Sequence, residues 1–251
     1  MRNSISLLFL LVVTIASCQS TNNSFARIEY SVFYNTELLN TKKGILEINL
    51  KENNAVFFLT ASTLESGSSV KGDVMTMIGK NAERYMKTTV DKKLIQYTEF
   101  IKNETYLIND TIPELKWEIN YEETKNVGDI VCNKAALKFR GRNFIAWYDM
   151  NTPLNFGPWK FNNLPGLILE IYDETKRYNW AARSVVFSNN PTVVVPIDTA
   201  VKQISYKNYI DLKYDQSSST LSAQMPRGVE TQAINVGRTG IETQFEWEQH
   251  E

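Results

Sequence analysis

Few side chains in this 251-residue chain have the chemistry for proton transfer or nucleophilic attack. The single histidine, His250, lies one residue from the C-terminus, in a polar tail that cannot hold a general base in a fixed geometry. This placement argues against a histidine-based catalytic triad and against a histidine-based zinc site. The sequence has no glycine-rich phosphate loop, Cys-x-x-Cys pair or EF-hand loop. We therefore expect no cofactor and no metal, and a protein that is not an enzyme.

Two carboxylates and one thiol could serve a hydrolase, which is therefore the alternative function. Asp149 and Glu170 flank a proline-rich bend, and desolvation would make either a candidate acid or base. A solvated charge at a sheet edge is the competing interpretation of Glu170. Cys132 has Lys134 two residues on, where a cation would activate a thiol, but a free cysteine is more commonly a small buried hydrophobe.

Residues 144–173 contain three of the seven prolines, Pro153, Pro158 and Pro165, between two expected strands. Because proline fixes φ and pushes the preceding residue toward an extended conformation, these residues specify one rigid path. Pro165-Gly166 suits the centre of a type II turn, with Gly166 at positive φ. Asn163 is a residue type that tolerates the left-handed conformation.

Aromatic side chains concentrate in the same bend. Trp and Tyr near rigid turns are enriched at recognition surfaces, so the bend is a candidate binding surface for a peptide, protein or amphiphile. Trp159 is the ring expected to be partly exposed. Filling of the core by these rings is the alternative interpretation. The candidate binding residues are Trp147, Tyr148, Phe156, Trp159, Lys160, Asn163, Pro165 and Gly166.

Period-two alternation of apolar and polar residues predicts an all-β, mainly antiparallel protein. We expect a single, strongly curved or half-barrel sheet with one or two short helices. One helix is expected at Ser205–Tyr214, with Ser205 as its N-cap, a loop at 62–82, and loose order over 215–243. The expected strands lie at 28–34, 44–50, 55–61, 94–101, 105–108, 117–121, 131–140, 143–148, 167–172 and 180–187.

The N-terminus is typical of a secretory signal. Arg2 precedes the apolar stretch Ile5–Ile15, which is too short to span a bilayer as a helix. The following Ile-Ala-Ser-Cys resembles a bacterial lipobox, in which Cys18 is acylated; a cleaved signal with a chance cysteine is the alternative. We expect a signal peptide at 1–17, a polar tether at 18–24 and one β-rich domain at 25–251.

An acylated Cys18 would place the domain in the cell envelope, attached to the membrane by its lipid anchor. The tether lacks an acidic run, which favours a periplasm-facing position at the outer membrane. Cys132 would then be the remaining thiol, so no intramolecular disulfide is expected. The net charge of −1 gives no electrostatic case for nucleic acid.

A charged strand face adds a further candidate surface. Lys134, Lys138 and Arg140 share one side of an expected strand, with Arg142 and Lys160 nearby. A solvated face that discourages aggregation is one interpretation. Docking to an acidic partner or to anionic headgroups is the other.

The run Asn163-Leu-Pro-Gly-Leu-Ile168 resembles the signature of the GLPGLI family of Bacteroidetes proteins, with Asn163 at the first glycine. The resemblance covers about residues 115–175, although 149–153 departs from the family pattern. It implies a secreted or lipid-anchored β-rich protein, often encoded beside outer-membrane transport genes, with no established reaction. The supporting motifs are Gly157–Phe161, Ala146–Tyr148, Cys132–Ala135, Trp117–Ile119 and Thr124-Lys125.

These observations favour a cell-envelope lipoprotein that acts as a non-enzymatic binding or accessory module. Its expected partner is a peptide, an amphiphile or an outer-membrane transport protein. A hydrolase and a self-assembling structural envelope protein are the alternatives.

Overall fold

The computed structural model describes residues 23–35, 39–60, 67–71, 74–78, 84–89, 91–192, 200–214, 238 and 240–248. The predicted signal peptide and lipobox lie outside these residues, as does most of the segment 215–243. Among the described residues, no helix is long and apolar enough to cross a membrane.

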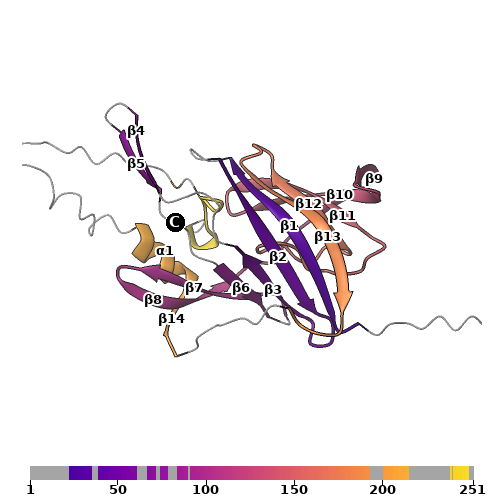
Figure 1. Ribbon diagram of the computed structural model, residues 1–251, viewed down its shortest axis with the longest axis horizontal. Coiled ribbons are helices and arrows are strands. Elements are labelled where there is room, and N and C mark those ends of the chain that lie inside the picture. Colours follow the sequence, from indigo (N-terminus) through magenta and orange to yellow (C-terminus); the bar gives the residue numbers. More distant parts are fainter. Residues whose placement is uncertain are drawn as a thin grey trace, which may run out of the picture.

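One 12-stranded sheet dominates the structure, in the order β14-β8-β7-β6-β3-β2-β1-β13-β12-β11-β10-β9 (Figure 1). Adjacent strands pair antiparallel except β14 and β8, which are parallel, so the predicted all-β, mainly antiparallel class is confirmed. The strands are β1 (Phe25–Asn35), β2 (Leu39–Asn49), β3 (Asn54–Leu59), β6 (Arg84–Thr88), β7 (Leu94–Ile101), β8 (Glu104–Thr111), β9 (Glu118–Val127), β10 (Ile130–Phe139), β11 (Arg142–Asp149), β12 (Leu167–Asp173), β13 (Tyr178–Ser188) and β14 (Lys202–Ser205).

Alternating burial explains why these segments form strands. In β1, Ile28, Tyr30 and Val32 are buried, while the residues between them are only partly buried. Because successive side chains of a strand point to opposite faces, this pattern places one face of the sheet against the core.

A separate hairpin lies where the sequence predicted a loop. Strands β4 (Gly67–Lys71) and β5 (Val74–Ile78) form their own two-stranded sheet. The prediction of a loop over 62–82 is therefore wrong in this part. Glycine is depleted in strands, so the backbone pairing of the two segments outweighs the composition that suggested a loop.

The large sheet curves strongly enough to bring its two ends together. Asp110 on β8 and Arg140 directly after β10 belong to the second and eleventh positions of the sheet, yet their side chains form an ion pair. Figure 1 shows β7 and β8 steeply inclined to β1, β2 and β13. The space between these two parts is occupied by helix α1 (Tyr206–Tyr214) and by the segment 240–248, which contains the 3-10 turn η3 (Glu246–Glu248).

Helix α1 begins where the sequence predicted. The Asn208 amide donates to Ser205 Oγ at 3.2 Å, so Ser205 is the N-cap. Tyr206, Tyr209 and Ile210 form the buried face of the helix. The last turn ends in Lys213 and Tyr214.

The proline-rich bend between β11 and β12 follows a path that was only partly predicted. Asn163 adopts the expected left-handed conformation, with φ of 67°, but Trp159 also has positive φ, of 56°. Gly166 does not, so its predicted positive φ is wrong. Glycine is required there for a different reason: a Cβ atom on Gly166 would lie 2.1 Å from the Asp149 carbonyl oxygen.

Candidate functional site

A buried ion network joins distant parts of the chain on the inner side of the sheet. The Arg140 guanidinium binds Asp110 with two hydrogen bonds, Nη1 to Oδ2 at 2.9 Å and Nη2 to Oδ1 at 2.8 Å. Neither side chain is more than 1% exposed. A bidentate pair of this kind is strong and fixes the relative orientation of its partners.

Lys160 and Glu242 complete this network. Lys160 Nζ lies 2.6 Å from Asp110 Oδ2 and 2.7 Å from Glu242 Oε2. Glu242 also meets Arg140 Nη1 at 2.5 Å and accepts a hydrogen bond from the Tyr206 hydroxyl. The bend, the C-terminal segment and helix α1 are thereby tied to both ends of the sheet. We call Asp110, Arg140, Lys160 and Glu242 the ion network.

Asp110 and Arg140 are held in their charged forms by their partners in the ion network. Burial alone would raise the pKa of Asp110, but Lys160 and Arg140 outweigh it and hold this pKa below its ordinary value. Burial likewise opposes the charge of Arg140, yet Glu242 and Asp110 raise its pKa. Because the folded-state pKa of Asp110 is lowered, its stabilising contribution is complete above its unfolded-state pKa and is lost as pH falls through the lowered value.

Aromatic rings surround the ammonium of Lys160. Its Nζ lies 4.3 Å from the ring centroid of Tyr206, 5.1 Å from that of Trp159 and 5.7 Å from that of Tyr97. Cation–π attraction of this kind strengthens where water is excluded. The rings therefore contribute to the stability of a buried amine and also form one wall of a cavity.

This cavity, of about 280 Å³, lies between the sheet, helix α1 and the segment 240–242. Its charged lining outside the ion network consists of Arg84, Glu99 and Lys213. Aromatic residues form a large part of its wall, among them Tyr34, Tyr97, Trp159, Tyr178, Tyr206 and Tyr209. We call it the aromatic cavity.

The tyrosines of the aromatic cavity are neutral hydroxyl groups near physiological pH. Burial raises the pKa of Tyr34, Tyr97 and Tyr209 above the ordinary value. A neutral phenol offers a flat apolar face together with one hydrogen-bond donor. The cavity can therefore hold an apolar or aromatic group and bond to a polar end of it.

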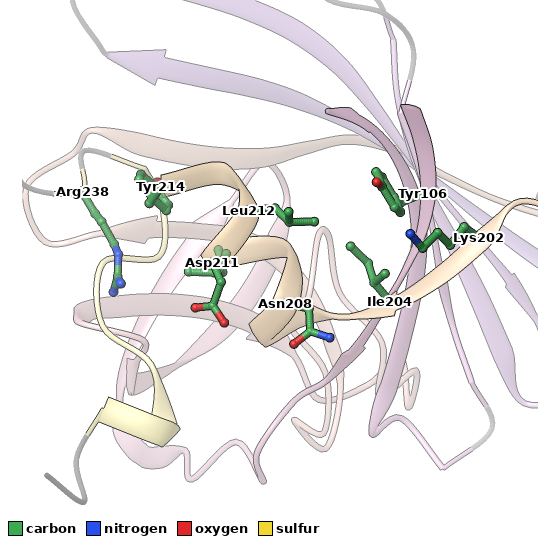
Figure 2. A pocket seen from close by; sticks show the side chains of 9 residues that line it. Tyr106, Lys202, Ile204, Asn208, Asp211, Leu212, Tyr214 and Arg238 are labelled. Carbon is green, nitrogen blue, oxygen red and sulfur yellow. The ribbon is translucent and has the colours of Figure 1, made fainter. Parts of the chain in front are cut away.

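A second hollow, of about 770 Å³, lies on the other side of helix α1 (Figure 2). Figure 2 shows Leu212 pointing from the helix toward Tyr106, Ile204 and Lys202, while Tyr214 and Arg238 lie at the opposite end. This hollow is wide and open, and it lacks buried charged groups among the residues that line it. We therefore take the aromatic cavity as the candidate functional site.

The structure places most of the predicted binding residues in the core. Asn163 and Pro165 are exposed, whereas the other six are buried. The prediction that Trp159 is partly exposed is wrong, because its ring packs against Phe161 at 5.1 Å and stacks on Trp180 at 6.0 Å. Of the eight, Trp159 and Lys160 line the aromatic cavity. The buried residues are Trp147, Tyr148, Phe156, Trp159, Lys160 and Gly166.

The predicted basic face does not form as a whole, because Lys138 is exposed but the other four residues are buried or paired. Arg140 and Lys160 are buried in the ion network, and Lys134 pairs with Glu123 at 2.8 Å. Arg142 is bound by backbone carbonyls of the C-terminal segment, at 2.8 Å to Gly240. The spacing of the basic residues could not reveal this, because their carboxylate and carbonyl partners come from elsewhere in the chain.

The candidate catalytic carboxylates are engaged in local structure. Asp149 is buried and accepts hydrogen bonds from the Asn151 amide at 2.9 Å and from Thr152 Oγ1 at 2.7 Å. Glu170 forms an ion pair with Lys125. Both carboxylates are therefore occupied by neighbouring side chains or backbone amides.

Cys132 is buried and is not activated as a nucleophile. Burial, with a further contribution from Asp149, raises the pKa of its thiol to about 11. Lys134, its expected activator, is paired with Glu123 instead. Within the described part of the chain, no three His, Cys, Asp or Glu side chains form a group that could hold a metal ion.

Sequence reasoning missed Asp110 and Glu242. The position of Asp110 could have been predicted from the sequence, because it follows Ile108 by two residues and therefore shares its face of the strand. In the structure that face of β8 points inward, and Asp110 is fully buried. An inward carboxylate on a strand requires a buried cation as partner. Nothing in the sequence around Glu242 indicates which cation it meets.

Comparisons with known proteins give little functional information. Residues 139–170 match the family described as "Protein of unknown function (Porph_ging)", and the curated proteins include no match. Residues 139–170 contain Arg140, Lys160 and the proline-rich bend.

Solved structures share part of the arrangement. Two crystal forms of PNGF-II, in space groups C2 and P21, each have a TM-score of 0.49, with 13% and 12% identity over 75% of this chain. The chain matches only about a third of PNGF-II, 32% and 33% of the two chains. An uncharacterized conserved protein from Thermus thermophilus has a TM-score of 0.39 at 8% identity, covering 73% of this chain and 91% of that one. These similarities are too weak to carry an argument.

Replacing Arg140 with methionine tests the ion network. Arg140→Met leaves Asp110 and Glu242 with one cation between them, and we expect a loss of about 3–5 kcal/mol in the free energy of unfolding. The control is Lys207→Met, which removes an exposed ion pair to Asp211 at 2.9 Å and should cost no more than about 0.5 kcal/mol. Urea unfolding followed by tryptophan fluorescence measures both; equal losses would contradict the role assigned to Arg140.

Proposed function

We propose that this protein is a cell-envelope lipoprotein that binds a small amphiphile or an apolar side chain of a peptide without catalysing a reaction. The observation that carries this proposal is the aromatic cavity on the inner side of the curved sheet. Its wall combines tyrosine and tryptophan rings with a few placed charges, which is the composition typical of small-ligand sites.

The size of the aromatic cavity limits its ligand. Pockets for small molecules usually measure about 300–1,000 Å³, so a volume of about 280 Å³ is just below this range. A single ring or a short apolar chain fits, whereas a complete membrane lipid does not. We therefore favour partial insertion of a ligand whose polar end stays at the mouth of the cavity.

The charged groups support binding rather than hydrolysis. The ion network is internally compensated, and Asp110 and Arg140 are held in their charged forms by their partners. A general acid or base needs a pKa near the working pH. Asp149 and Glu170 are bound by local partners, and Cys132 is a protonated thiol. The hydrolase alternative thus has no supporting geometry among the described residues.

The envelope location rests on sequence features. The lipobox-like Ile-Ala-Ser-Cys supports acylation at Cys18, and the run Asn163–Ile168 supports membership of the GLPGLI family. The family match over 139–170 is compatible with this assignment. We propose a lipid anchor at the outer membrane, facing the periplasm, with an outer-membrane transport protein as a candidate partner.

Loss of Cys18 tests the anchor. We expect Cys18→Ala to abolish incorporation of a labelled fatty acid and to move the protein from the detergent phase to the aqueous phase in Triton X-114 partitioning. Cys132→Ala is the matched control. Because the Cys132 thiol is buried, this substitution should change neither the fatty-acid labelling nor the partitioning. Retention of the label by the Cys18→Ala protein would disprove lipidation at this residue.

Removal of one ring tests the aromatic cavity as the binding site. The soluble domain, from Ser20 onward, should increase the fluorescence of the apolar probe N-phenyl-1-naphthylamine. Tyr209→Leu should weaken this binding by about tenfold, which corresponds to the contribution of one aromatic contact. Tyr121→Leu, at an exposed ring on β9, should bind like the wild type. Equal affinity in all three proteins would place the binding elsewhere.

A further inference from the structure

The amine of Lys213 lies at the aromatic cavity without a carboxylate partner among the described residues. Its Nζ is 5.4 Å from the ring centroid of Tyr209 and 5.6 Å from that of Tyr214. Lys213 is an exposed residue, and the neighbouring protein lowers the pKa of its ammonium below the ordinary value by desolvation. Among the described residues, the ammonium faces two aromatic rings and forms no ion pair with a carboxylate.

The two carboxylates that line the aromatic cavity each bind a cation other than Lys213. Glu99 binds Arg84 at 2.7 Å, and Glu242 belongs to the ion network with Lys160. Arg84 and Lys160 thus each have an internal counter-ion in the described part of the chain, whereas Lys213 does not. The geometry leaves one unmatched positive charge beside a ring-lined space.

Lys207 on the same helix shows the ordinary alternative. Like Lys213 it is exposed, but it pairs with Asp211 one turn further on, at 2.9 Å. Lys213 has no such partner on helix α1, and it lies on the side of the helix that lines the aromatic cavity. The partial negative charge at the helix C-terminus favours a cation at position 213. It does not explain why this cation lines the aromatic cavity.

Resting on the proposed function, we propose that the aromatic cavity selects a small organic acid, whose apolar body contacts the rings and whose carboxylate binds Lys213. An ion pair between the carboxylate and the amine would supply the counter-ion that the described residues do not provide. The neutral hydroxyl groups of the surrounding tyrosines can donate to the second carboxylate oxygen. The preference is for acids over neutral molecules of the same shape.

A matched pair of ligands tests this selectivity. We would titrate the soluble domain at pH 7 with 4-phenylbutyrate and with 4-phenylbutyramide, using isothermal calorimetry. The acid should bind the wild type at least about tenfold more tightly than the amide, as expected for a charge-assisted hydrogen bond. Lys213→Met should remove this preference while leaving the affinity for the amide within about twofold of the wild type. Lys207→Met should keep the preference.

The outcomes separate this inference from the proposed function. Equal affinity of acid and amide for the wild type would overturn the role of Lys213 and leave the aromatic cavity as a binding site. An equal loss of affinity for the acid and the amide in Lys213→Met would also overturn the role of Lys213. The residue would then act by supporting the helix and not by binding the carboxylate. Binding of neither ligand, together with no binding of the naphthylamine probe, would overturn the proposed function as well.

Discussion

The contact between Asp110 and Arg140 is the constraint on which the rest of the structure depends. These residues belong to opposite ends of the sheet, and only strong curvature brings β8 and the end of β10 together. Taking both charges out of water is costly, and the cost is offset only if each has good hydrogen-bonding partners. Lys160 and Glu242 supply these partners from two other segments. Curvature of the sheet, placement of the bend and docking of the C-terminal segment are thereby coupled.

The proline-rich bend contributes to the interior rather than to the surface. Its path turns Trp159 and Lys160 inward, where the ring stacks on Trp180 and the ammonium reaches Asp110. Trp159 adopts positive φ, which is unfavourable for a bulky residue and is retained only when the surroundings determine it. The prolines and Gly166 restrict the chain to this path, so the same residues that looked like a recognition motif position one wall of the aromatic cavity.

Residue patterns along the sequence predicted most of the strands and the start of the helix. The site was predicted less well, because its ion pairs join residues that are far apart in the sequence. Period-two alternation located the main strands, and Ser205 marked the start of helix α1, because burial and capping act on neighbouring residues. The curvature depends on contacts such as Arg140 to Glu242, which are 102 residues apart and leave no periodic trace. Lys160 was identified as a site residue for its place beside Trp159, but its carboxylate partners were not. A sequence shows that a charge exists and does not show which distant group compensates it.

Ionisation of Asp110 is the most direct test of this account, because the ion network requires a buried carboxylate that stays charged. Carbon-13 NMR of the side-chain carboxyl group, followed from pH 7 toward acid, measures its titration. The account predicts that Asp110 is still ionised at a pH equal to the ordinary aspartate pKa of about 3.9, and that it titrates only at lower pH, together with the loss of native structure. A titration midpoint at or above about 5 would show that burial outweighs Arg140 and Lys160, and it would contradict the ion network as the contact that joins β8 to the end of β10.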